Sequence, residues 1–168
     1  MAEAKTGVFW DMEDCPIPEG LDPGSVYRNI KSALANNGYG GEVTICAFGD
    51  KNQIPGYFES AGIELVRAGD KRARLLGMMN DFFSWVRQNR GAGSSNLMVI
   101  SHDTSEFASC LDGLAEIGQR ILLAQPRMTP RRCRKCRVNT ASAEWLWETL
   151  AAGGDPIVIP KDPSHDHH

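Results

Sequence analysis

The sequence contains no long apolar run. Its longest hydrophobic stretches, at residues 96–101 and 121–125, are far shorter than the ~20 residues of a membrane-spanning helix. The opening MAEAKT lacks the apolar core of a secretory signal. We therefore expect a soluble, intracellular protein without a membrane partner, with the cytoplasm favoured and an organelle as the alternative.

Cysteine is scarce, and its number is odd. The five cysteines and the missing signal indicate reduced thiols rather than a disulfide framework. Cys133 and Cys136 have the spacing of half a zinc site, but no second pair with that spacing is present. Three histidines near the end of the chain could complete such a site: His165, His167 and His168. Zinc binding, a redox pair or disulfide, and two ordinary thiols stay open, and we favour ordinary thiols.

What the sequence does contain is enough material for one domain. Its 168 residues are 42% hydrophobic and 23% charged, which is the balance of a single globular domain with a complete core. We expect one domain over residues 1–154, followed by a flexible tail over residues 155–168. The sequence leaves open whether the protein forms a homodimer or belongs to a longer parent protein with additional domains.

Charge is unevenly distributed along the chain. The formal net charge of −3 divides into −5 for residues 1–126, +6 for residues 127–137 and −4 for residues 138–168. An acidic body with one dense basic segment indicates a local contact with an anion rather than a basic coat over the whole surface. A solvated loop is the alternative for this segment.

Short β-rich runs alternate with segments of helical periodicity, a pattern typical of βα units around a parallel sheet. We expect strands at residues 7–11, 42–48, 63–68, 97–101 and 120–124. We expect helices at residues 25–37, 55–61, 72–89, 105–117 and 141–152. Right-handed crossovers then predict an α/β, Rossmann-like fold, with a central parallel sheet of about five strands in the order 3-2-1-4-5 flanked by helices.

The side-chain pattern predicts local features of these elements. Ser25 is the expected N-cap of the first helix. Trp10 should point to the opposite side of its strand from Asp11, because side chains alternate along a strand, and we expect it to pack in the core. The longest helix should present a broad apolar face made of Leu75, Met78, Met79, Phe82, Phe83 and Val86.

Acidic side chains come at the ends of three expected strands. Asp11 ends the first strand, Asp50 follows the second and Asp103 follows the fourth. The carboxyl ends of parallel strands lie at one edge of a sheet, and the predicted order makes the first and fourth strands neighbours. Carboxylates that meet there repel one another unless a hard divalent cation binds them, and Mg²⁺ or Mn²⁺ is the natural candidate. An ordinary turn residue is the alternative for each acid, above all for Asp50.

A metal ion held by such acids is suited to the hydrolysis of a phosphodiester bond. Metal-bound water can attack in line while the metal offsets charge on the departing oxygen. This reaction requires no covalent nucleophile. A phosphatase would need one, and the segment DMEDC at residues 11–15 lacks the D-x-D-x-T arrangement expected of that class.

Four segments together resemble a known family. They are VFWDMEDCPIP, FGDKNQIP, the long helix that carries Asp81 and Trp85, and VISHDTSEFASCLDGLAEIGQRILLAQP. This set is similar to the NYN domain, a branch of the PIN-like nucleases, and in particular to its plant and limkain-type members. The likeness spans residues 7–126. It implies a metal-dependent endoribonuclease built on a Rossmann-like sheet.

The resemblance also implies roles for particular residues. Asp11, Asp81 and Asp103 match the main acids of the family, and would bind the metal ion and serve catalysis. Asp14 falls where the family motif D-x-E-N has Asn, and an Asp there can still bind a metal or orient water. Asp50, from the strand-end pattern, would assist as a further metal ligand.

One departure from the family leaves a second interpretation open. Relatives carry an Asp-Lys pair about six residues before the helical acid, and this chain has Leu75 and Leu76 there. Asp70 is the acid that could substitute. The two interpretations are a working nuclease with fewer acids and an RNA-binding module with weak or absent catalysis. We favour the nuclease.

Single-stranded RNA is the expected partner, held largely through its phosphates. The basic segment would supply Arg131, Arg132, Arg134 and Lys135 for this contact. A second basic cluster comprises Lys71, Arg72 and Arg74. Asn52 and Gln53 follow a strand end and should contact the substrate, because polar residues at that place line the ligand crevice of such sheets.

Overall fold

A six-stranded parallel sheet forms the centre of the protein in its computed structural model. The structure describes residues 3–49, 57–90, 95–102, 107–126 and 140–157. The strands are β1 (Thr6–Asp11), β2 (Val43–Gly49), β3 (Ile63–Arg67), β4 (Asn96–Ile100), β5 (Arg120–Gln125) and β6 (Ala141–Leu146). Their order is β3-β2-β1-β4-β5-β6, and every neighbouring pair is parallel. The predicted α/β class and the predicted order of the first five strands are therefore confirmed.

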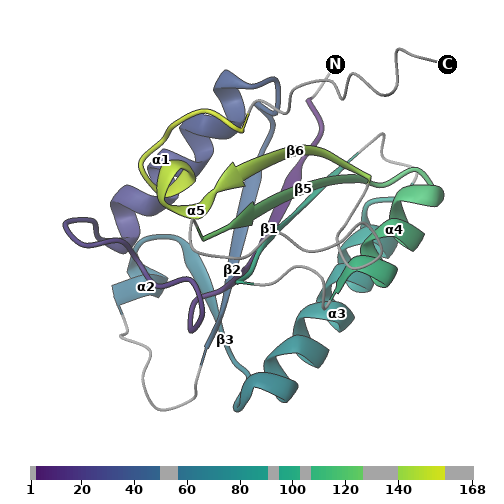
Figure 1. The fold of residues 1–168 in the computed structure, drawn as a ribbon, viewed down its shortest axis with the longest axis horizontal. Helices are drawn as coiled ribbons and strands as arrows, with labels where there is room; N and C mark the ends of the chain where they lie inside the picture. The colour runs from purple at the N-terminus through teal and green to yellow at the C-terminus, as the bar shows by residue number, and fades with distance from the viewer. Residues whose placement is uncertain (1–2, 50–56, 91–94, 103–106, 127–139, 158–168) are drawn as a thin grey trace, which may run out of the picture.

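Helices cover both faces of this sheet (Figure 1). They are α1 (Pro23–Asn36), α2 (Tyr57–Ser60), α3 (Lys71–Gln88), α4 (Ala108–Glu116) and α5 (Trp147–Ala151). One apolar core lies between the sheet and α1, α2 and α5, and a second lies between the sheet and α3 and α4. Within the described part of the chain, no helix combines the length and apolarity that crossing a bilayer requires.

Side chains of β1 alternate between the two cores. Val8 and Trp10 face the core with α1 and α5, whereas Phe9 faces α3, where its ring lies 5.4 Å from that of Phe82. Trp10 is fully buried, which confirms the prediction that it packs in the core on the side opposite Asp11. The alternation therefore directs the carboxylate of Asp11 toward the α3 side of the sheet.

The prediction of a helix over residues 141–152 is wrong for its first half. Residues Ala141–Leu146 form β6, which pairs in parallel with β5, and only Trp147–Ala151 are helical. Trp145 is 1% exposed and lies opposite Ala124, so pairing with β5 buries a large side chain. This tertiary gain outweighs the helix propensity of Ala, Glu and Leu in the segment.

Two smaller expectations also need correction. The N-cap of α1 is Asp22 rather than Ser25, since Asp22 Oδ1 accepts a hydrogen bond of 2.7 Å from the backbone N–H of Ser25. Pro23 then fits the first turn, where no donor is needed. In α3, Phe83 is 50% exposed, so the prediction that it belongs to the apolar face of this helix is wrong.

Gly7 sets how closely α3 can approach β1. A Cβ atom at Gly7 would lie 2.7 Å from the indole of Trp85 in α3. Gly7→Ala should therefore destabilise the fold by about 1–3 kcal/mol, measured by urea unfolding, because Trp85 has to move. Gly113→Ala in α4 is the control, since a Cβ there meets nothing within 4 Å. Equal unfolding midpoints for the two variants would contradict this account.

Candidate active site

Asp11 ends β1 and is fully buried. Its Oδ1 accepts hydrogen bonds from the backbone N–H groups of Glu13 (3.1 Å) and Asp14 (3.3 Å), and its carbonyl accepts from Cys15 (3.0 Å). The chain therefore turns tightly around the carboxylate. The other oxygen, Oδ2, is buried and has no hydrogen-bond partner among the described residues.

Arg74 of α3 is the cation that faces this carboxylate. Its Nε lies 3.2 Å from Asp11 Oδ1, and its Nη2 lies 3.9 Å from Asp14 Oδ1. The side chain of Arg74 is 8% exposed and that of Asp14 is 30% exposed. The prediction that grouped Arg74 with the exposed phosphate-binding cations is wrong, because this guanidinium is buried against acids of the protein itself.

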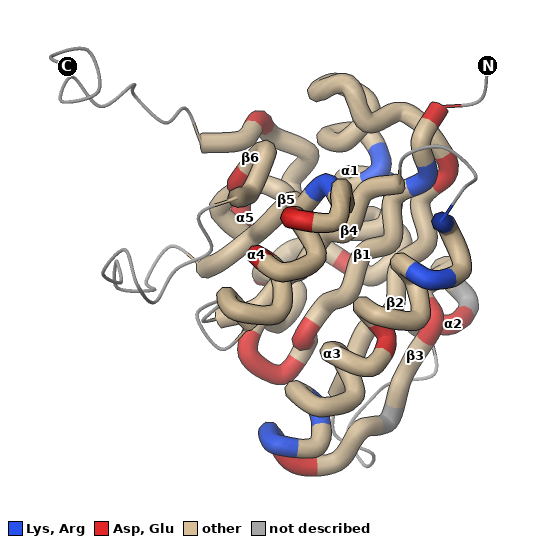
Figure 2. Tube along the Cα trace, turned by 90° about the vertical axis from the view of Figure 1, so that its right-hand side faces the viewer, with Lys and Arg blue, Asp and Glu red and all other residues tan. Residues whose placement is uncertain are grey.

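The first turn of α3 brings basic residues to the end of the molecule at which Asp11 lies. Lys71 and Arg72 are exposed, in keeping with the predicted contact with an anion. Figure 2 shows the basic residues at the start of α3 near the acidic turn that follows β1. Asp70 accepts a hydrogen bond of 2.9 Å from Ala73 N–H and so serves as the N-cap of α3. Leu76, at one of the two positions where the sequence resemblance led us to expect a charged pair, is 52% exposed.

The electrostatics of Asp11 are dominated by its burial. Burial raises the pKa of Asp11, and the nearby charge of Asp14 raises it further. Arg74 and the two backbone N–H groups lower this pKa, but the net direction is upward. Burial thus outweighs the ion pair. Oδ2, which is buried and unpartnered among the described residues, is the atom at which a further cation would compensate the charge of this carboxylate.

Two tryptophans hold the turn after β1 in place. The indole of Trp10 donates a hydrogen bond of 2.7 Å to the carbonyl of Cys15, and that of Trp147 donates one of 2.8 Å to the carbonyl of Pro16. One bond comes from β1 and the other from the start of α5, so elements from both ends of the chain fix the turn. Asp14 is thereby presented beside Asp11.

A hollow of about 270 Å³ adjoins this turn, lined by Asp14, Pro16, Ile17, Pro18, Glu19, Pro126, Trp147 and Glu148. Sequence reasoning missed Glu148, which lies in the first turn of α5. The pKa of the Cys15 thiol is raised by burial first and then by Asp11, Asp14 and Glu148, so Glu148 belongs to the same acidic surroundings. The strand-end pattern would have found Glu148 had β6 been predicted as a strand.

Asp81 lies further along α3, seven residues after Arg74 or ~10 Å of helix. Partial burial raises its pKa, and the charge of Glu64 adds to the effect. The thiol of Cys46 donates to Glu64 Oε2 at 3.5 Å, and burial, Glu64 and Asp81 raise the pKa of Cys46 to about 12. Cys46 of β2 lies opposite Phe9 of β1, and Phe9 is two positions before Asp11. Asp81 and Asp11 therefore have different electrostatic neighbours.

Several predicted site residues lie outside the described residues, and their roles stay predictions: Asp50, Asn52, Gln53, Asp103, Arg131, Arg132, Arg134 and Lys135. β1 and β4 are neighbours, as a meeting of Asp11 and Asp103 requires. In the described ranges alone, no three Asp, Glu, His or Cys side chains gather to hold a metal ion.

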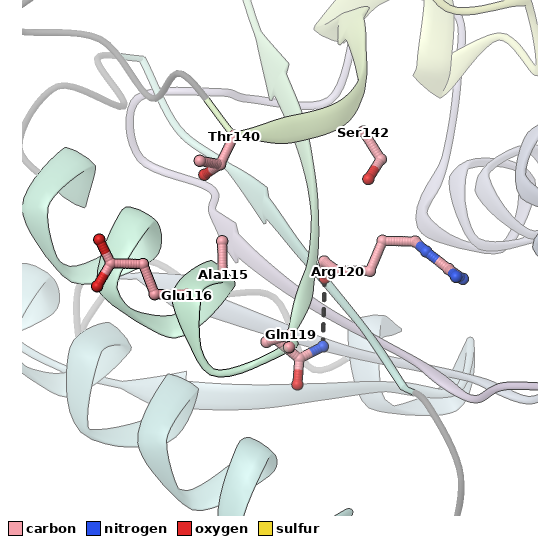
Figure 3. A pocket seen from close by; sticks show the side chains of 7 residues that line it. Ala115, Glu116, Gln119, Arg120, Thr140 and Ser142 are labelled. Carbon is pink, nitrogen blue, oxygen red and sulfur yellow. Dashed lines mark hydrogen bonds between the residues drawn. The ribbon is translucent and has the colours of Figure 1, made fainter.

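A larger hollow of about 490 Å³ lies at the opposite edge of the sheet (Figure 3). It is lined by residues at the amino ends of β5 and β6, including Gln119, Arg120 and Thr140. Arg120 donates a hydrogen bond of 3.0 Å to Asn96 Oδ1 and lies over the ring of Tyr39. This cation is engaged in structural contacts, and the hollow is remote from Asp11.

The fold and this site define a parallel α/β domain with a buried acid at the end of its first strand. A family model of the NYN domain matches residues 5–142, which is most of the chain. The protein belongs to the NYN domain family, with its PIN-like nuclease fold. Comparison with the curated proteins gave no match.

The partial burial of Asp81 and its repulsion by Glu64 together predict a pH-dependent effect on stability. Because the pKa of Asp81 in the folded protein lies above its ordinary value, the wild type gains stability as the pH falls through that raised pKa. In EDTA, which removes any bound metal ion, Asp81→Asn should therefore stabilise the fold at neutral pH by about 0.5 kcal/mol, a small effect because Asp81 is partly exposed and solvent screens its charge. Urea unfolding should find this advantage reduced near about pH 4.

Glu116→Gln on α4 is the control for this comparison, since Glu116 is exposed and lies on another helix. A loss of stability on Asp81→Asn at neutral pH would contradict the prediction. It would mean that a cation balances the charge of Asp81.

Proposed function

We propose that this protein is a metal-dependent endoribonuclease that hydrolyses single-stranded RNA. The observation that carries the proposal is the carboxylate of Asp11, fully buried at the carboxyl end of β1 with Oδ2 unpartnered among the described residues. Membership of the NYN family supports it. So does the exposed basic turn of α3 at the same end of the molecule, because RNA is attracted through its phosphates.

The donor groups at this edge suit a hard divalent cation. Asp11 and Asp14 are carboxylates, and an unpartnered buried oxygen is the kind of ligand that Mg²⁺ or Mn²⁺ takes. Asp103, Asp50 and Asp81 are the further ligands that we propose from the sequence. A bound ion would lower the pKa of a coordinated water and offset charge on the phosphate.

The remaining roles fall to side chains of the chain itself. The turn after β1 holds Asp11 rigidly, since its Oδ1 already accepts two backbone hydrogen bonds. Lys71 and Arg72 would attract the RNA backbone, and Asn52 and Gln53 would contact the nucleotide near the scissile bond. The basic segment would add sequence-independent contacts to phosphates.

The ion pair between Arg74 and Asp11 favours a second candidate function. A carboxylate that already has an internal cation can exist without a metal ion. The second candidate is therefore an RNA-binding module of NYN type whose catalysis is weak or absent.

Cleavage of labelled single-stranded RNA in Mn²⁺, Mg²⁺ or EDTA tests the first candidate. We expect cleavage with either metal and none in EDTA. Asp11→Asn and Asp103→Asn should each lower the rate by about a hundredfold or more, because each removes a negative metal ligand. Glu116→Gln, at the opposite edge of the sheet, should leave the rate unchanged.

Cleavage that persists in EDTA and in both aspartate variants would overturn the metal mechanism. Binding of RNA without cleavage by the wild type would favour the RNA-binding module.

The basic segment should contribute to affinity rather than to folding. Replacing Arg131, Arg132, Arg134 and Lys135 by Ala should weaken RNA binding and reduce the salt dependence of the binding constant, by about 0.7 in log-log slope for each phosphate that is no longer neutralised. Fluorescence anisotropy at several salt concentrations measures both. The control is a variant in which the same number of exposed cations elsewhere, including Arg28 and Arg87, is replaced by Ala. Equal effects in the two variants would remove the segment from the proposed RNA contact.

A further inference from the structure

Arg74 is a buried cation in a place where the proposed function needs a metal ion. It comes from a helix whose neighbouring cations are exposed, yet its own side chain is 8% exposed and aimed at two carboxylates. Burying a guanidinium costs free energy unless acids compensate its charge. The burial of Arg74 therefore depends on the two carboxylates that it faces.

The contacts of Asp11 divide unequally between its two oxygens. Oδ1 has three donors, namely Arg74 Nε at 3.2 Å and two backbone N–H groups. Oδ2 has no partner among the described residues. Asp14 is held more loosely, with 3.9 Å between its Oδ1 and Arg74 Nη2. Oδ2 and Asp14 are therefore the groups that a divalent cation can take while Arg74 stays in place.

A divalent cation at Oδ2 would be close to the guanidinium, and two cations in a buried site repel each other strongly. We propose that Arg74 is the resident cation of this site, which holds Asp11 in the metal-free protein and weakens the binding of divalent cations. The inference rests on the proposed function, since it concerns the same carboxylates. It makes Arg74 a positioning residue for Asp11 and a determinant of metal affinity.

A merely structural arginine predicts a different outcome. Its removal would lower stability and leave the metal affinity unchanged or reduced, because the carboxylates would lose their order. A resident cation predicts that its removal lowers stability in EDTA and at the same time tightens the binding of Mn²⁺. The two measurements together separate the alternatives.

Titration with Mn²⁺, followed by the EPR signal of the free ion, tests the proposal on the full chain. Arg74→Met, which keeps much of the side-chain volume without the charge, should bind Mn²⁺ about tenfold more tightly than the wild type or better. Arg74→Lys keeps a positive charge and should bind Mn²⁺ about as weakly as the wild type. Arg87→Met, exposed in the last turn of the same helix, should bind Mn²⁺ as the wild type does.

Thermal unfolding in EDTA and in Mn²⁺ gives the second readout. Arg74→Met should have a lower Tm than the wild type in EDTA, and saturating Mn²⁺ should raise its Tm by more than it raises that of the wild type. Adding Asp11→Asn to Arg74→Met should abolish the gain in Mn²⁺ affinity.

The proposal is overturned if Arg74→Met binds Mn²⁺ no more tightly than the wild type. It is also overturned if the double variant with Asp11→Asn still binds Mn²⁺ tightly. If Arg74→Met does not fold, Arg74→Gln is titrated instead, because it retains a donor for Asp11 without the charge. The same gain is expected, and its absence is equally decisive. A gain in Mn²⁺ affinity upholds the inference even if neither the wild type nor the Arg74 variant cleaves RNA. The titration therefore distinguishes a failure of this inference from a failure of the proposed nuclease activity.

Discussion

A carboxylate in the interior of a protein has to be compensated for the water it has lost, and Asp11 imposes this requirement on the whole carboxyl edge of the sheet. Two backbone N–H groups and one guanidinium converge on its Oδ1. Burial nonetheless keeps its pKa above the ordinary value, so these partners do not fully replace the solvent. The turn after β1 supplies the two backbone donors, and the first turns of α3 supply the guanidinium.

The scaffold around Asp11 is made rigid by groups with no role in chemistry. The indole N–H groups of Trp10 and Trp147 bind carbonyls of the turn, and both rings are buried in the same core, 5.1 Å apart. On the other face, Gly7 lets the ring of Trp85 lie directly on β1. This contact lies at the amino end of the strand and fixes how closely α3 approaches β1, whereas the two indole hydrogen bonds fix the turn beside Asp11.

Membership of the NYN family accounts for the fold, and the contact between Arg74 and Asp11 is seen in the structure itself. Among the residues that the structure describes, one guanidinium faces two carboxylates, which leaves these three groups with a net negative charge. A site of this kind can be stable without a metal ion and still accept one. The two functions that we propose, a nuclease and an RNA-binding module, share this fold and would differ in how tightly the site binds a cation.

Periodicity and strand-end chemistry were enough to predict much of this protein. The alternation of β and helical patterns predicted the order of the first five strands, and the alternation within GVFWD predicted that Trp10 and Asp11 face opposite ways. These are local rules of backbone geometry, so a single sequence carries them. The Arg74–Asp11 pair joins residues 63 positions apart, β6 forms only because β5 offers a partner, and Glu148 reaches the site only through β6. Such contacts depend on how separate elements pack, which only the tertiary structure decides.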